Sequence, residues 1–411
     1  MIVVVSACAA PAIPIATVDA PDVHHDETRL FTIWLGGARV GSATEIEDWS
    51  ATGVVLRRTE TLTFLRGEAP VAMTTTIEIA ADAALVPSTV TWTERGAQTR
   101  HASARRDERG WLVDIGGEQL RLAGTAIPAE LVPLYVRRDG KFAGDIFLPA
   151  RGFVGGRGRI DPVAPARLVA RLALEAGPIA EATIDVDRDG SPARVVDGEG
   201  VIALRATAAQ LRAPFDPVDL VAATSIPLTG TRDPHRVRLA LVGDIALPAV
   251  PGQAAELRAA GLEVALGPRL PGALPAGIAG ADRTREIAAL VAGVQQRIVP
   301  DLGASIATPR DASAATAGDC TTFALAYAAT AQRAQIPTRV VTGLRVDGER
   351  LVRHRWAVSW TGRAWIAVDA AFGRAPAGGD LIGLAVHDPD DAGLIAGEAA
   401  LMQVRAAAWT R

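Results

Sequence analysis

Short runs of alternating polar and apolar residues, separated by turn residues, fill the chain from His24 to about Phe215. The stretches TTTIEI and STVTWTE alternate with a period of two, which is typical of antiparallel strands with one buried and one wetted face. A parallel α/β sheet would instead show continuous apolar runs. The pattern therefore predicts an antiparallel β-rich domain over residues 24–215, folded as a half-barrel or as a sandwich.

The composition indicates a globular protein of two or three domains. The length of 411 residues exceeds one ordinary domain of roughly 100 to 200 residues. Hydrophobic residues make up 49% of the chain but aromatic residues only 4%, so the cores must consist of Ala, Val, Leu and Ile. The net charge is −4 and no basic run with interleaved aromatic residues occurs, so we expect no nucleic-acid partner.

The two cysteines, Cys8 and Cys320, are too few for a disulfide framework. The stretch VSAC, which ends at Cys8, resembles the lipobox of bacterial lipoproteins, in which cleavage exposes a cysteine for acylation. The signal is incomplete, because the apolar run before it is short and no basic residue precedes Arg29. We expect residues 1–23 to be a signal and tether, with Cys8 lipidated and the protein exported, as a periplasmic or membrane-anchored lipoprotein.

The rest of the chain divides into a connecting part and a last unit. Residues 216–281 hold a few strand candidates and the Pro/Gly-rich stretch LGPRLPGALPAGIAG, which predicts a β extension and a linker. The last unit, residues 282–411, opens with a helix over Asp282–Val299. No run of about 18 apolar residues occurs anywhere, so we expect membrane contact only through the lipid anchor.

Cys320 opens an apolar segment that has no charged residue as far as Gln332. A helix that is apolar on every face is buried, so the pattern predicts a buried helix with Cys320 in its first turn. Backbone N–H groups at a helix start favour a thiolate and can hold an oxyanion. Asp319 either opposes the thiolate electrostatically or caps the helix. The alternative is a buried, inert cysteine that packs as a small hydrophobe.

A histidine and an aspartate follow in a predicted hairpin. Strand patterns cover residues 339–346, 351–360 and 363–370, and His354 lies on an apolar face of the middle strand. If the second turn is centred on Thr361-Gly362, His354 and Asp369 lie directly opposite each other, about 5 Å apart at Cβ. The alternative is a cross-strand contact that only satisfies two polar groups. With Cys320 in the same unit, we instead predict a Cys-His-Asp triad.

Four stretches in this order resemble the bacterial transglutaminase-like superfamily of papain-fold thiol enzymes. They are Gly318-Asp319-Cys320, the stretch from Ile336 to Gly343, His354-Arg355-Trp356, and Trp365 to Asp369. The resemblance implies a papain-like α+β domain over residues 282–411, with Cys320 as nucleophile, His354 as general acid and base, and Asp369 as the orienting group. Arg355 and Ala370 depart from the family, which usually has a small residue and often Pro at these places. Within the β-rich part, LVPLYVRRDGKFAGDIFLP resembles β-rich envelope domains of bacteria.

The other histidines lack partners at metal-ligand spacing, so we expect no metal and no cofactor. These are His24, His25, His101, His235 and His387.

We therefore predict an α+β enzyme of the bacterial cell envelope that transfers acyl groups from peptide or protein amides through a Cys320 thioester. Water as acceptor would make it a cysteine peptidase or amidase, which we favour, and an amine would make it a cross-linking transglutaminase. A non-catalytic peptide-binding module of the same fold is the alternative from another class. No triad residue is missing, which favours the enzyme.

Overall fold

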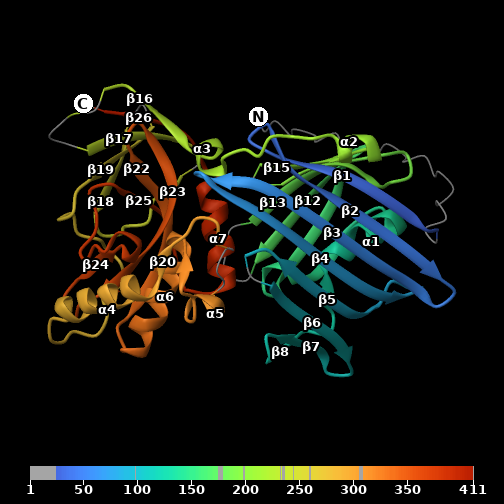
Figure 1. Cartoon of the computed structure of the whole chain (residues 1–411), viewed down its shortest axis with the longest axis horizontal. Coiled ribbons are helices and arrows are strands. Elements are labelled where there is room, and N and C mark those ends of the chain that lie inside the picture. The colour runs from blue at the N-terminus through green and yellow to red at the C-terminus, as the bar shows by residue number, and fades with distance from the viewer. Residues whose placement is uncertain are drawn as a thin grey trace, which may run out of the picture.

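The computed structural model describes residues 25–97, 99–174, 179–197, 200–231, 233, 237–243, 245–258, 261–304 and 309–410. The chain forms two large sheets, with helices around the second one (Figure 1). This is an α+β architecture, which confirms the predicted fold class. The first sheet contains the N-terminal half of the chain, and the second contains the C-terminal half together with part of the connecting residues. No helix in these ranges is long and apolar enough to cross a membrane.

The first sheet is one continuous surface of 15 strands in the order β8-β7-β6-β5-β4-β3-β2-β1-β15-β14-β13-β12-β11-β10-β9. Its first eight strands are β1 Glu27–Leu35, β2 Ala38–Ser50, β3 Gly53–Arg66, β4 Ala69–Asp82, β5 Pro87–Arg95, β6 Thr99–Asp107, β7 Gly110–Ile115 and β8 Glu118–Leu122. The others are β9 Ile127–Pro128, β10 Phe142–Leu148, β11 Val154–Ala164, β12 Arg167–Leu174, β13 Ile179–Val186, β14 Pro192–Val196 and β15 Val201–Arg205. The neighbours pair antiparallel except β9 and β10, so the predicted meander is confirmed.

This sheet curves around helix α1 (Val132–Asp139), which fits the half-barrel alternative better than the sandwich (Figure 1). The short η1 (Ala129–Leu131) leads into α1, and η2 (Pro149–Arg151) follows β10. Trp111 of β7 and Phe147 of β10 are fully buried and meet edge to face, with ring centroids 5.2 Å apart. Offset and edge-to-face contacts between rings stabilise a core beyond the burial of their area.

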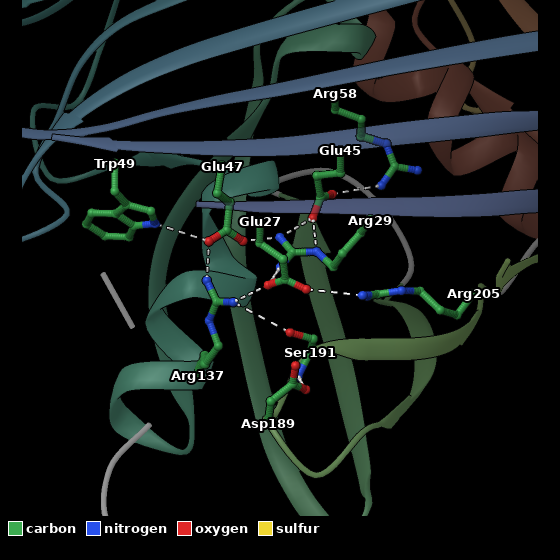
Figure 2. A network of polar contacts seen from close by, with 10 residues as sticks. All are labelled: Glu27, Arg29, Glu45, Glu47, Trp49, Arg58, Arg137, Asp189, Ser191 and Arg205. Atoms are coloured by element: carbon green, nitrogen blue, oxygen red, sulfur yellow. Dashed lines mark hydrogen bonds and ion pairs between the residues drawn. The ribbon is translucent and has the colours of Figure 1, made fainter. Parts of the chain in front are cut away.

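A network of buried charges fixes α1 to the sheet (Figure 2). Arg29 of β1 is only 2% exposed and pairs with Glu45 and Glu47 of β2. Arg137, in the last turn of α1, pairs with the same Glu47 and with Glu27, at 3.0 Å from the latter. Moving the helix would break these ion pairs and leave buried charges without a counter-charge, which is costly. The network therefore holds α1 in one position on the sheet.

The second sheet has the order β18-β19-β17-β26-β16-β23-β22-β25, with β24 beside β23. Its strands are β16 Ile226–Thr229, β17 Val237–Gly243, β18 Gln253–Arg258, β19 Gly261–Leu266, β22 Thr338–Asp347, β23 Arg350–Trp360, β24 Trp365–Val368, β25 Leu381–His387 and β26 Val404–Trp409. The β extension predicted from the connecting residues therefore forms one side of this sheet. The Pro/Gly-rich stretch that follows β19 has neither helix nor strand in its described residues.

Several helices lie around this sheet, and one short strand pair leads into them. They are α4 Thr284–Arg297, α5 Pro309–Ala312, α6 Cys320–Arg333, α7 Asp391–Leu401 and the short η3 Ala370–Phe372. Helix α2 Ala208–Arg212 instead packs on β1 of the first sheet, and α3 Leu220–Ala223 contacts β3 and β23. Every residue from Thr321 to Ala328 is buried, which confirms the buried helix predicted behind Cys320. Strands β20 Val299–Pro300 and β21 Ala317–Gly318 pair in parallel and hold the chain that enters α6.

Candidate active site

Cys320 is the first residue of α6 and is half-buried. Asp319 caps the helix, because its Oδ1 accepts hydrogen bonds from the backbone N–H groups of Thr321 at 2.9 Å and Thr322 at 3.2 Å. Gly318 is needed before the cap, since a Cβ at this position would collide with the Thr322 side chain. The local sequence thus sets Cys320 at a helix start, where the positive end of the helix dipole lies.

His354 of β23 and Asp369 are in contact: Nε2 of His354 lies 3.0 Å from Oδ2 of Asp369. Both side chains are buried, with 5% of His354 and 0% of Asp369 exposed. The thiol of Cys320 also lies close enough to raise the pKa of His354. Because Nε2 is bound to Asp369, Nδ1 is the ring nitrogen left to face the thiol.

The predicted register of the hairpin is wrong. Trp360 pairs with Trp365, so the connection is a four-residue loop and not a two-residue turn. Thr361 closes this loop, because its hydroxyl donates to the carbonyl of Ala364 at 2.9 Å and accepts from the N–H of Ala364 at 3.1 Å. Strand β24 ends at Val368, and Asp369 lies just beyond it, so that it reaches His354 along a diagonal of the ladder.

Arg374, which the sequence analysis missed, holds Asp369 in place. Its Nη2 donates to Oδ2 of Asp369 at 3.0 Å, and its Nη1 contacts both carboxylate oxygens of Asp380 at 3.0 Å. The backbone N–H groups of Asp369 and Arg374 also donate to each other's carbonyls, at 2.8 and 2.9 Å. No periodic pattern marks Arg374 in the sequence, because it follows a short turn after the strand.

Charges around His354 favour its protonated form. Burial by itself would lower the pKa of His354, but the hydrogen bonds to Asp369 and Cys320 and their negative charges outweigh it and raise that pKa to about 9. Burial would raise the pKa of Asp369, and the hydrogen bonds from His354 and Arg374 lower it instead. An imidazolium held by a carboxylate is the partner that a nucleophilic thiolate needs.

Two aromatic rings flank the imidazole. The Trp356 ring stacks on His354 with centroids 6.0 Å apart and an interplanar angle of 20°, and the Phe372 ring is tilted at 5.5 Å. Phe372 remains 50% exposed, so this ring forms the solvent side of the site. The rings restrict the rotation of His354 and keep water from its faces.

Arg355, the residue that departs from the family pattern, bridges the start of α6 and helix α7. Its Nη1 donates to the hydroxyl of Thr321 at 3.1 Å, and its Nε donates to the hydroxyl of Thr342 at 3.0 Å. Its Nη2 pairs with Glu398 of α7. Arg355 therefore fixes the first turn of α6 and brings its positive charge to Thr321, the residue that follows Cys320.

The remaining sequence candidates do not join this site. His387 is buried, its Nε2 lies 2.9 Å from the Thr342 hydroxyl, and burial lowers its pKa to about 4, so it is neutral at pH 7. His101 is exposed next to Thr93 on the first sheet. The described ranges contain no cluster of three or more residues that could hold a metal ion. Cys8, His24 and His235 lie outside the described residues.

Comparisons with known proteins give two matches. Residues 276–370 match the family model described as the transglutaminase-like superfamily. Among solved structures, a DUF1089 family protein from Pseudomonas aeruginosa is similar at 15% identity, over 38% of this chain and 88% of that chain. Its TM-score of 0.26 is too low to inform the fold or the function. A comparison with curated proteins gave no match.

The matched residues contain helix α6 and strands β22, β23 and β24. They also contain Cys320, His354 and Asp369: His354 is hydrogen-bonded to Asp369, and Cys320 lies close enough to raise the pKa of His354. The superfamily is one of thiol-dependent acyl transfer in general. Residues 276–370 of this chain therefore form a domain of the transglutaminase-like superfamily.

Proposed function

We propose that the protein is a cysteine peptidase or amidase, which transfers an acyl group from a peptide or protein amide to Cys320 and then to water. One observation carries the proposal: His354 is hydrogen-bonded to Asp369, and the thiol of Cys320, at the start of a buried helix, lies close enough to raise the pKa of His354. A nucleophile, a base and an orienting carboxylate in hydrogen-bond contact are the minimum that this chemistry requires. The papain-like description of the domain is part of the same proposal.

In the first half of the reaction, the Cys320 thiolate attacks the amide carbonyl carbon and forms a tetrahedral intermediate. The imidazolium of His354 gives its proton to the amine as the C–N bond breaks, and a thioester remains. In the second half, His354 takes a proton from water as the water attacks the thioester. The C–S bond then breaks, the acid leaves, and the pair of Cys320 thiolate and His354 imidazolium is restored. Asp369 keeps its charge throughout and holds the imidazole in one tautomer.

The start of α6 supplies an oxyanion donor in this mechanism. Asp319 Oδ1 occupies the N–H groups of Thr321 and Thr322. The N–H of Cys320 itself is thus the donor of this turn that a tetrahedral oxyanion would use. Removing one donor of this kind costs about 100- to 1,000-fold in kcat in other acyl-transfer enzymes.

The test compares wild type with Cys320→Ala, both in a Cys8→Ser background so that one thiol is counted. We expect wild type to cleave members of a peptide library read by mass spectrometry, and to be captured covalently by a peptide aldehyde. Cys320→Ala should lose turnover by at least about 1,000-fold, because no other group can form the thioester.

Equal turnover by the two variants would exclude thiol chemistry. Incorporation of an added primary amine into the products, in place of hydrolysis, would make the protein a transglutaminase. Peptide binding without turnover or capture in wild type would favour the non-catalytic module.

We also propose that the protein is exported and anchored through Cys8. The support is the lipobox-like VSAC followed by a tether of small residues and prolines. Metabolic labelling with a clickable fatty acid, on a gene extended to any upstream start codon, should label wild type and not Cys8→Ala. Equal labelling of both proteins, or of neither, would exclude the anchor.

A further inference from the structure

The hairpin between β3 and β4 of the first sheet reaches the start of α6 in the second half of the molecule. Arg66, the last residue of β3, pairs through Nη2 with Oδ2 of Asp319, 253 positions later in the chain. Its Nη1 donates to the carbonyl of Leu302 at 3.2 Å. Leu302 follows β20, the strand that pairs with β21 directly before α6. One guanidinium thus contacts both the helix cap and the loop beside it.

The backbone of the hairpin is itself fixed. The N–H of Gly67 donates to Oδ1 of Asp219 at 2.8 Å, and the N–H of Leu65 donates to the carbonyl of Val218 at 2.8 Å. Asp219 also caps α3. The φ of Gly67 is +65°, a conformation that glycine adopts without strain. The backbone on both sides of Arg66 is therefore fixed by hydrogen bonds, and the side chain reaches Asp319 from this fixed position.

The Asp319 carboxylate has two opposite effects on its neighbour Cys320. As a cap it stabilises the helix start, where the thiolate is favoured. As a negative charge next to the thiol it disfavours the thiolate. With only 3% of the Asp319 side chain exposed, water screens this charge poorly. A cation bound to its second oxygen removes the unfavourable effect and leaves the cap intact.

We propose that Arg66 is a positioning residue for Cys320, which neutralises the Asp319 carboxylate and so lets the first sheet set the reactivity of the thiol. The inference rests on the proposed function only in taking Cys320 as the nucleophile. It gives the first sheet a role in the chemistry of the second half of the molecule.

Other charged groups near the start of α6 make contacts that do not involve Arg66. From β23 come His354 and Arg355, the latter paired with Glu398. Beside η3, Asp369 is bound by Arg374. Asp311 of α5 contacts Arg100 at 3.3 Å. Arg297 of α4 donates to the carbonyl of Ser313. Asp301, which follows β20, accepts a hydrogen bond at Oδ1 from the N–H of Gly303. Strand β22 faces α6 with the uncharged Val340.

The test measures the rate of Cys320 alkylation by iodoacetamide against pH, in the full chain with Cys8→Ser. Arg66→Gln should shift the midpoint of the profile upward by about one pH unit, which makes alkylation near neutral pH about 10-fold slower. Arg66→Lys keeps the charge and should restore most of the rate. Arg57→Gln is the matched control, because Arg57 lies on the same strand in an exposed pair with Glu78, and it should change nothing.

Asp319→Asn separates the charge from the structure, because asparagine caps helices as well as aspartate does. It should move the midpoint downward, opposite to Arg66→Gln, because Arg66 is then left without its counter-charge, and Arg66→Gln added to it should bring the midpoint back to near the wild-type value. A purely structural ion pair would make both single variants shift in the same direction, which would overturn the inference. An unchanged profile in Arg66→Gln would overturn it as well.

The outcomes for the two proposals can be told apart. If the wild-type thiol alkylates slowly at every pH, Cys320 is no nucleophile and the proposed function fails with the inference. If the wild-type thiol is reactive and cleaves peptides but does not respond to Arg66→Gln, only the inference fails.

Discussion

Neighbours on several sides hold the imidazole of His354 in one orientation. Asp369 binds Nε2, Cys320 contacts the ring, and the Trp356 and Phe372 rings lie beside it. Asp369 in turn is fixed by Arg374 and by its own backbone. Groups held in this way lose little further freedom when a substrate binds, which is the condition for efficient acyl transfer.

We predict that Asp369→Asn leaves the protein folded but lowers kcat by about 1,000- to 10,000-fold, because the amide stabilises the wrong imidazole tautomer. The measurement is steady-state turnover of a cleaved peptide, together with a thermal melt to verify folding. Asp380→Asn is the matched control, since Asp380 shares Arg374 with Asp369 but does not contact His354. If Asp369→Asn keeps turnover close to wild type, Asp369 is not the orienting residue.

Among the elements, η1 and α1 depend most on the groups that they bury. The charges around Arg29 and Arg137 tie the C-terminal end of α1 to β1 and β2 (Figure 2). At the other end, Glu130 of η1 has a carboxylate oxygen that is buried without a hydrogen-bond partner. Burial raises the pKa of Glu130 from 4.5 to about 7, although its own backbone N–H and Arg58 act in the opposite direction.

This raised pKa predicts a pH-dependent stability. The protonated Glu130 stabilises the fold fully below the unfolded value of 4.5, and this contribution is lost as the pH rises through about 7. Glu130→Gln should therefore be more stable than wild type at pH 8, by on the order of 2 kcal/mol, and similar to it below pH 4.5. Urea unfolding at both pH values measures this, with Glu78→Gln on the surface as control. A constant difference between the two proteins at all pH values would contradict the assignment.

The elements also differ in how well the sequence predicts them. The apolar segment behind Cys320 and the alternating strands are predicted, because their periodicity reports burial directly. The hairpin register is not, since the hydrogen bonds of Thr361 decide the loop length and leave no periodic mark. His354 and Asp369 still meet, because a diagonal pair lies within side-chain reach. Arg374 and Arg66 act through positions that no local pattern connects to the site.

In the whole molecule the two sheets meet around the start of α6 and helix α7, which lies between the halves in Figure 1. Arg66 contacts Asp319 there, and Arg100 of β6 lies 3.3 Å from Asp311 of α5. At α7, Gly152 approaches Asp391 so closely that a Cβ would lie 2.6 Å from the carboxylate oxygen. The first sheet is thus in contact with Asp319, the cap of the helix that carries Cys320. We therefore expect changes in the first sheet at Arg66 to alter the reactivity of the Cys320 thiol.

Strand β26 has a consequence for the way the protein is made. It lies between β16, which it joins in parallel, and β17, which it joins antiparallel. A ribosome must translate about 160 residues beyond β17 before β26 can enter this gap, and such distant pairings form slowly. A nascent chain that already contains Cys320, His354 and Asp369 still lacks the strand that completes their sheet. Assembly of that sheet therefore follows synthesis of the candidate catalytic residues and does not accompany it.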